Sequence, residues 1–352
     1  NKTIKLELSK TSGNAGLFNS LAPGAKIEDL NVVVSTEDGK SLQMDGDSHF
    51  GGVLGVVNMN GACTLSNISV SGVLKYGKPT RGNYLIVGGL IGEIESVDSN
   101  YARTTIENCY SDITIEADLE NWKGNDLYAF GGLIGKVAPF GNGNKTIVKN
   151  SYSTGSIDVS AANDIYLVAG GLIGDIALKD LQTKNINFEI TNCYSAVSVK
   201  VQKTISGTPN KDSAAGGLIG RISVSSTGNK VENCVVLNPH VLTIASAATN
   251  GNDPHVWNNR MVGRLATSNA GTLNNYALSG ILTGTTSTGT SNTGQGAEED
   301  TNITTKDAAW FSNKDNWIGL GFDTGNWDFT GLKITNDAET SVYPKLKKVS
   351  SN

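Results

Sequence analysis

A five-residue repeat constrains the fold of this chain more than any other feature of its sequence. Identical copies of Gly-Gly-Leu-Ile-Gly occupy residues 88–92, 131–135, 170–174 and 216–220. Degenerate copies end at Asn19, Gly55 and Gly263. The copies recur about every forty residues, and self-similarity at such a period marks a repeat architecture in which each unit buries its apolar face against its neighbours. We therefore expect one elongated body and look for function on its surface.

A second motif follows each pentapeptide and reads apolar, polar, Asn, then apolar or small, as in Ile106-Glu107-Asn108-Cys109. Its first residue is expected to point inward and its second toward water, as alternation along a strand requires. Asn enters the left-handed region readily, so it would form a bend and return the next side chain to the interior. Stacked Asn amides would also hydrogen-bond along a column. The asparagines are Asn67, Asn108, Asn150, Asn192, Asn233 and Asn275, with Asp29 in the first copy.

Three of the four cysteines, Cys109, Cys193 and Cys234, follow the motif Asn. We expect them in one interior column, where they act as small apolar side chains with free thiols. A bridge between Cys193 and Cys234 is the alternative. The cysteines include no close pair and the three histidines lie in unrelated contexts, so their spacing indicates neither a disulfide framework nor a metal site. We expect no cofactor.

The pentapeptide predicts one wall of the repeating unit. The residue after it varies and the next is aliphatic, so we expect the variable residue to face solvent. A ladder of alternating charge would result, with cross-strand pairs worth ~0.2–1 kcal/mol each. The variable residues are Glu93, Lys136, Asp175 and Arg221. The closing glycines are expected in the interior, where they let backbones approach closely; they are Gly92, Gly135, Gly174 and Gly220.

The fourth pentapeptide position is expected to point outward although it is always aliphatic. Such a stripe would form a sizeable apolar patch. We expect inter-strand loops or the C-terminal segment to cover it, and a partner-binding face is the alternative. The stripe consists of Leu54, Ile91, Ile134, Ile173, Ile219 and Val262.

These patterns predict an all-β chain: a right-handed parallel β-helix, or solenoid, of about seven coils over residues 1–283. Residues 284–304 are rich in Gly, Ser and Thr and indicate a connector. Residues 305–352 carry Trp310, Trp317 and Trp327. They are expected to cap the open end of the solenoid, and stacking on a sugar ring is the alternative. Length differences between copies fall in loops, which often form the binding face of solenoids.

Composition excludes several function classes. The net charge is −5, and the sequence has neither a Lys/Arg cluster nor a basic groove motif, so we expect no nucleic-acid role. Because no apolar stretch approaches eighteen residues, we expect no membrane span. The chain begins without an export-signal pattern, and we expect a mature fragment whose signal has been removed.

The repeat resembles the GLUG repeat, named for its Gly-Leu-x-Gly core. The resemblance is carried by Gly131-Gly132-Leu133-Ile134-Gly135 with the trailing Asn150-Ser151-Tyr152, and by a tail running from Trp327-Asp328-Phe329 to Tyr343-Pro344-Lys345-Leu346. It covers most of residues 15–347 and departs at Asn19 and Asp29. The resemblance implies a β-solenoid of secreted or surface-attached bacterial proteins, many of them adhesin-like, and it supplies no catalytic residues.

We therefore expect a non-catalytic module at the bacterial cell surface, or secreted, that serves adhesion or ligand binding through its inter-strand loops. Its partner would be an extracellular glycan or a host or bacterial surface protein. No nucleophile elbow, zinc-protease motif or phosphate loop is present. One alternative is a carbohydrate-active enzyme, which would need converging carboxylates, whereas acids such as Asp112, Asp118 and Asp164 are spread along the chain. The other is a structural spacer.

Overall fold

The computed structural model describes most of the chain, and the fold below refers to these residues alone. They are residues 2–9, 12–58, 61–81, 84–95, 103–119, 127–138, 144–177, 187–205, 211–223, 229–247, 256–265, 271–286 and 303–347. Strands predominate among them, and the two α-helices are short: α1 (Ala308–Phe311) and α2 (Lys314–Gly319). Two 3-10 turns occur at η1 (Glu37–Gly39) and η3 (Ala338–Thr340).

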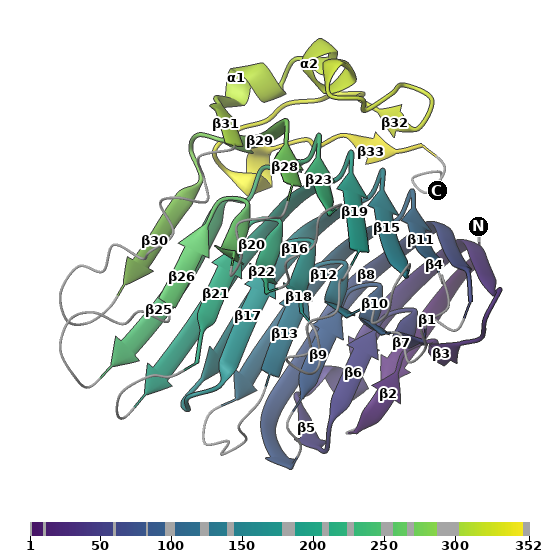
Figure 1. Cartoon of the computed structure of the whole chain (residues 1–352), viewed down its shortest axis with the longest axis vertical. Helices are drawn as coiled ribbons and strands as arrows, with labels where there is room; N and C mark the ends of the chain where they lie inside the picture. The colour runs from purple at the N-terminus through teal and green to yellow at the C-terminus, as the bar shows by residue number, and fades with distance from the viewer. Residues whose placement is uncertain are drawn as a thin grey trace.

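The chain visits three parallel sheets in turn and repeats the circuit along the molecule (Figure 1). Sheet B contains β2 (Gly13–Ala15), β6 (Ser48–Gly51), β9 (Leu85–Gly88), β13 (Leu127–Gly131), β17 (Tyr166–Gly170), β21 (Ser213–Gly216) and β26 (Val256–Asn259). Sheet C contains β3 (Phe18–Leu21), β7 (Leu54–Asn58), β10 (Ile91–Glu95), β14 (Ile134–Ala138), β18 (Ile173–Ile176), β22 (Ile219–Ile222) and β27 (Val262–Leu265).

Sheet A is the largest and receives one or more strands from each circuit. It contains β1 (Lys2–Leu8), β4 (Lys26–Thr36), β5 (Leu42–Asp45), β8 (Cys63–Arg81), β11 (Arg103–Glu107), β12 (Tyr110–Leu119), β15 (Lys145–Lys149), β16 (Tyr152–Ala161), β19 (Asn187–Thr191), β20 (Tyr194–Ile205), β23 (Lys230–Glu232), β24 (Val235–Val236), β25 (His240–Ala247), β28 (Gly271–Leu273), β29 (Asn275–Leu278), β30 (Leu282–Thr286) and β31 (Ile303–Lys306). The predicted all-β chain with parallel strands is confirmed, and the arrangement is consistent with a β-solenoid.

The motif asparagines form the bends of sheet A. The backbone of Asn108 has φ 54°, in the left-handed region, and the same conformation recurs at Asp29 and at five other asparagines. Asn donates along the column at two places, from Asn67 to Asp29 over 3.0 Å and from Asn108 to Asn67 over 3.4 Å. The motif residues with this conformation are Asp29, Asn67, Asn108, Asn150, Asn192, Asn233 and Asn274.

The last copy of the motif requires a one-residue correction. Glu232 pairs with Leu273, which places Asn274 and not Asn275 at the bend. Asn275 instead takes the interior position. Its side chain accepts from the backbone amide of Cys234 over 2.9 Å and donates to the carbonyl of Val231 over 2.9 Å. Two adjacent asparagines made the register ambiguous in the sequence.

The aliphatic stripe expected on the outside is in the main hydrophobic core, so that prediction is wrong. Ile91 and Ile94 are both buried in this core. Neighbouring strands of sheet C pair through Ile91, Glu93 and Ile94, and Gly92 is skipped in the ladder. The alternation is therefore broken at the glycine, as at a β-bulge, and residues three apart face the same side. The stripe residues in this core are Leu54, Ile91, Ile134, Ile173, Ile219 and Val262.

The pentapeptide glycines stand where sheets B and C meet. A Cβ on Gly131 would collide with the carbonyl oxygen of Ile134, and one on Gly135 would lie 2.6 Å from the carbonyl oxygen of Gly92. Backbone therefore fills the space that a side chain would need, which is the close approach expected of these glycines.

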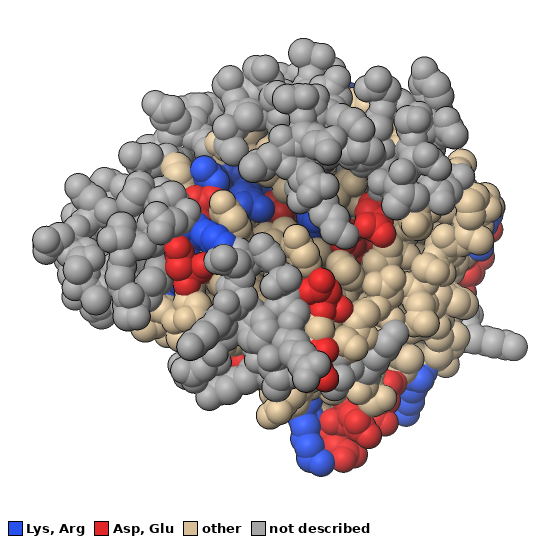
Figure 2. Space-filling model, turned by 60° about the horizontal axis from the view of Figure 1, so that its bottom comes forward, with Lys and Arg blue, Asp and Glu red and all other residues tan. Residues whose placement is uncertain are grey.

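The charged residues after the pentapeptides are buried, so the expected solvent-facing ladder is also wrong. Glu93, Lys136 and Asp175 are each 2% exposed or less. They lie in a layer between sheets B and C, because His49 of β6 contacts Glu93 and the guanidinium of Arg221 lies over the ring of Tyr166. Tyr166 in turn packs against a small apolar cluster that includes Ile86 and Val168. In contrast, acidic and basic side chains are interspersed on the surface shown in Figure 2.

The ions of this layer neutralise one another along the stack. Lys136 donates to Glu93 over 2.8 Å, and Nε2 of His49 lies 2.8 Å from the same carboxylate. Burial raises the pKa of Glu93, but the attraction of Lys136 and the His49 hydrogen bond outweigh it and lower this pKa to about 2. Burial alone would lower the pKa of Lys136, and the Glu93 charge raises it overall. Both groups are therefore charged at neutral pH.

The C-terminal segment, residues 303–347, lies mainly along the side of the stack. It joins the last circuit through β31, which pairs with β29. It then runs back over sheet A toward earlier strands (Figure 1). Near its end the segment forms an antiparallel pair of its own, between β32 (Trp327–Asp328) and β33 (Lys345–Leu346). The predicted end cap is therefore limited to β31, and the aromatic side chains cover a flank. None of the described helices is long and apolar enough to cross a membrane.

Candidate ligand-binding grooves on sheet A

The outer faces of β12, β16 and β20 carry the polar side chains that we consider for function. Alternation along β12 buries Ile113 and Ile115 and exposes Asp112 and Glu116. The three strands pair in register without interruption, so equivalent side chains form columns that run across the sheet, with neighbouring members of a column ~4.8 Å apart.

The first column is aromatic. Tyr110 stacks on Tyr152 with ring centroids 4.8 Å apart, and Tyr152 stacks on Tyr194 at 4.6 Å. The C-terminal segment packs against this stack through Trp327 and Tyr343. These tyrosines therefore join two parts of the chain that are remote in sequence.

A groove of 530 Å³ lies between the tyrosine stack and the C-terminal segment, and we call it the tyrosine groove. On the sheet wall of the groove, Thr154 donates to Asp112 of the neighbouring strand over 2.9 Å. Burial raises the pKa values of Tyr110 and Tyr343, so both present neutral phenols that donate and accept hydrogen bonds. The groove is lined by Tyr110, Asp112, Tyr152, Thr154, Tyr194, Ser341, Val342, Tyr343 and Lys345.

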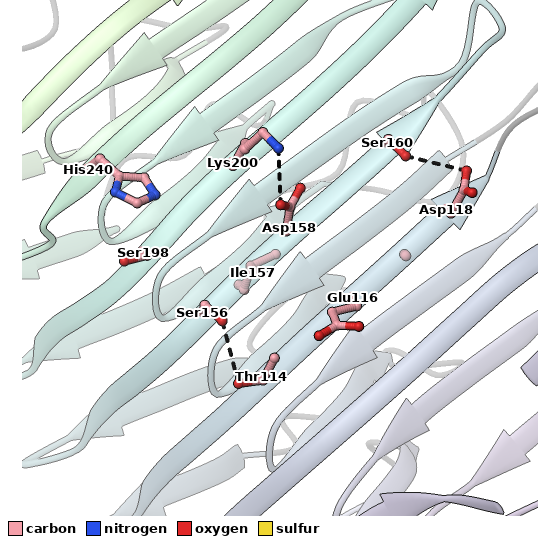
Figure 3. A pocket seen from close by; sticks show the side chains of 11 residues that line it. Thr114, Glu116, Asp118, Ser156, Ile157, Asp158, Ser160, Ser198, Lys200 and His240 are labelled. Carbon is pink, nitrogen blue, oxygen red and sulfur yellow. Dashed lines mark hydrogen bonds and ion pairs between the residues drawn. The ribbon is translucent and has the colours of Figure 1, made fainter. Parts of the chain in front are cut away.

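A second groove of 570 Å³ follows on the same strands, and we call it the polar groove (Figure 3). The hydroxyl groups of Thr114, Ser156 and Ser198 form one column of side chains in this groove. In the next column, Glu116 is the cross-strand neighbour of Asp158. Lys200 pairs with Asp158 over 3.1 Å. The lining comprises Thr114, Glu116, Ala117, Asp118, Ser156, Ile157, Asp158, Ser160, Ser198, Lys200 and His240.

The carboxylates of the polar groove are paired with lysines. Glu116 and Asp158 are exposed, and each forms an ion pair with a lysine of the next strand. Lys75 lies 3.1 Å from Glu116, and Lys200 lies 3.1 Å from Asp158. A glycoside hydrolase needs a carboxylic acid whose pKa is raised by an apolar site beside a second carboxylate. Exposed, lysine-paired carboxylates do not provide that environment. Within the described residues, no group of three metal-ligating side chains converges.

The three acids that are spread along the sequence do not converge in the structure. Asp112 lies in the tyrosine groove and Asp118 in the polar groove. Asp164 is turned toward Lys203, whose Nζ lies 2.9 Å away, and it accepts from the backbone of Lys211. The three are therefore not one constellation.

The interior residues singled out in the sequence lie behind the outer face of sheet A. Cys109, Cys193 and Cys234 are buried free thiols. Burial raises the pKa of Cys109 to about 12, which makes this thiol a structural and unreactive group. Ser151 shares their column and its Oγ accepts from the amide of Cys109 over 3.2 Å. None of them reaches solvent.

The inter-strand loops expected to bind ligands fall mostly outside the described residues, including residues 120–125. The sequence reasoning overlooked the tyrosine stack as a site. Its signal was present in the motif, because Tyr110, Tyr152 and Tyr194 each follow the interior Cys or Ser directly. Equivalent positions in successive repeats become neighbours in space. An aromatic residue repeated there therefore forms a ladder on the outer face of sheet A, and the C-terminal segment covers Tyr152 and Tyr194, which are buried.

No protein-family model, curated protein or solved structure matches this chain. The likeness to the GLUG repeat therefore rests on the motif residues alone.

Proposed function

We propose that this chain is a non-catalytic ligand-binding module of a secreted or surface-attached bacterial protein, and that it binds an extracellular glycan on the outer face of sheet A. In this proposal the chain is a right-handed β-solenoid of about seven coils with residues 303–347 packed along its flank. The observation that carries it is the convergence of tyrosine rings, hydroxyls, a carboxylate and an ammonium in the tyrosine groove.

The chemistry of this groove matches a sugar ring. Phenol rings combine an apolar face with a polar edge, so they pack against a ring's C–H groups and hydrogen-bond its hydroxyls. Asp112 accepts hydrogen bonds only, whereas Thr154 both donates and accepts. Pockets that combine aromatic walls with a few placed polar groups are the usual form of small-ligand sites. The GLUG likeness supports the surface location.

A glycan array on the full chain, followed by calorimetric titration of the hits, tests this function. We expect Asp112→Asn and Tyr343→Ala each to weaken glycan binding at least about tenfold, the loss of roughly one charge-assisted hydrogen bond or one ring contact. Glu37→Gln, on the exposed turn η1, is the matched control and should leave affinity unchanged. Negative results with glycans would reject the proposal, and further negatives with matrix proteins would favour a spacer.

A further inference from the structure

We propose that the tyrosine groove and the polar groove are two subsites of one elongated site for an uncharged, linear glycan that lies along β16. This inference rests on the proposed function and specifies its ligand: an oligosaccharide of several rings without acidic groups.

The two grooves adjoin on the same strands and the same face. Thr154 lines the tyrosine groove and Ser156, two residues farther along β16, lines the polar groove. On β12 the same step leads from Asp112 to Thr114. Residues two apart on a strand lie ~7 Å apart, and the eight steps from Tyr110 to Asp118 span about 27 Å. That length accommodates several linked sugar rings.

The charge of this face opposes an acidic polymer. Its outward carboxylates are Asp112, Glu116, Asp118 and Asp158. The cations beside them are Lys75, Lys200 and Lys345, two of which are already paired with carboxylates. A uronate or sulfated chain would therefore meet an excess of like charge, which costs affinity. Neutral sugar hydroxyls can instead donate to these carboxylates.

The column of hydroxyl groups in the polar groove supplies both hydrogen-bond donors and hydrogen-bond acceptors. Thr114, Ser156 and Ser198 follow one another across the sheet in the polar groove. Ser156 and Thr114 are 3.5 Å apart, at the long limit of a hydrogen bond, so their mutual contact is weak. Their hydroxyls are thus suited to exchange this contact for hydrogen bonds to a sugar.

The backbone pairing favours a glycan over an extended peptide. Peptides that bind sheets usually add a strand to an open edge. Strand β16 pairs with β12 on one side and with β20 on the other, so its backbone groups are occupied along the proposed site. Only side chains are available to a ligand here, and side-chain recognition of hydroxyls is what a neutral glycan requires.

A length series tests the two-subsite arrangement in the full chain. The probes are neutral gluco-, manno- and xylo-oligosaccharides of one to six rings, with oligogalacturonides of equal length, titrated by calorimetry. We expect the affinity for at least one neutral series to rise at least tenfold from two rings to six. Oligogalacturonides should bind at least tenfold more weakly than the neutral series.

Variants separate the subsites. Asp118→Asn and Ser156→Ala, both on the exposed polar groove, should weaken the six-ring ligand several-fold and leave the two-ring ligand unchanged, whereas Asp112→Asn should weaken both. Equal affinity at all lengths, no effect of the polar-groove variants, or preference for the oligogalacturonides would overturn the inference while leaving glycan binding standing. Absence of binding by every probe and on the glycan array would reject the inference and the proposed function together.

Discussion

Arg221 holds the carboxylate of Asp175 through two parallel hydrogen bonds, Nε to Oδ1 and Nη2 to Oδ2, each 2.9 Å long. The two residues face each other on neighbouring strands of sheet C, and both are buried. Burial alone would lower the pKa of Arg221, but the charge of Asp175 raises it. The bidentate geometry therefore links successive repeats through charged groups at a position where most proteins place apolar ones.

Breaking this pair should cost far more stability than breaking an exposed one. We expect Arg221→Met to lower the free energy of unfolding by about 3–5 kcal/mol, because the Asp175 charge stays buried without its partner. The double variant Arg221→Met/Asp175→Leu should recover much of this loss. The control pair Lys145 and Glu189, each side chain about three-tenths exposed, should cost only about 0–1 kcal/mol when broken. Urea unfolding of the parent, the single variant, the double variant and a variant that breaks the control pair measures these losses. Equal losses at the two sites would contradict the strong contribution assigned to the buried pair.

The ion pair of Glu93 predicts loss of stability in acid. The pKa of Glu93 is lowered to about 2 in the folded chain from 4.5, so the unfolded chain binds the proton more tightly. The stabilisation is present above pH 4.5 and is lost as the pH falls from there toward 2, with an amplitude of roughly 3 kcal/mol. Urea titrations between pH 6 and pH 2.5 measure this slope. Glu93→Gln should be less stable at pH 6 and should lose the corresponding part of the pH dependence; an unchanged slope would show that other carboxyls cause it.

The repeat period, the bends and the interior thiols followed from the sequence because they depend on local chemistry. Asn150 adopts a conformation that few other residues tolerate, and Cys193 is a small apolar group. The orientation of Ile134 and Lys136 did not follow, because strict alternation was assumed through Gly135. A glycine allows a bulge, and one skipped residue transfers every later side chain to the other face.

The candidate site was hidden for a different reason. The tyrosine groove needs Tyr152 from one circuit and Tyr343 from a segment almost two hundred residues later, and no local pattern reports that contact. Tryptophans near an open solenoid end suggested a cap. In the structure, Trp310 stacks on Tyr276 of the last circuit, whereas Trp327 reaches Tyr152 and Tyr194 of earlier ones.

The pentapeptide glycines should not tolerate a methyl group. A Cβ on Gly132 would lie 2.0 Å from the carbonyl oxygen of Gly171 and 2.9 Å from Cβ of Ser153. Gly132→Ala must therefore separate two neighbouring turns, and we expect a loss of at least about 2 kcal/mol. Gly319→Ala is the control, because no atom lies within 4 Å of its added Cβ; it should be neutral or stabilise by up to about 1 kcal/mol. Equal melting temperatures for Gly132→Ala and the parent would refute the close-approach argument.

The phenol of Tyr194 anchors the C-terminal segment to sheet A. Its hydroxyl donates to the carbonyl of Pro344 over 2.6 Å in a buried setting. Tyr194→Phe leaves that carbonyl without its donor, so it should destabilise the contact by about 1–3 kcal/mol. The effect should concentrate in residues 326–346, which are held to the flank by few strand pairs, and raise their amide hydrogen exchange about tenfold or more. Exchange within β12 should change little.

Tyr76→Phe provides the matched control for this prediction. The hydroxyl of Tyr76 is buried and has no hydrogen-bond partner among the described residues, and its ring packs on Phe50. Removing an unsatisfied hydroxyl relieves a desolvation cost, so this variant should be neutral or more stable. Loosening of residues 326–346 by Tyr194→Phe but not by Tyr76→Phe would assign the anchoring to the Pro344 hydrogen bond. If both variants exchange as the parent does, the segment is held by ring packing alone, and Trp327→Ala should then release it.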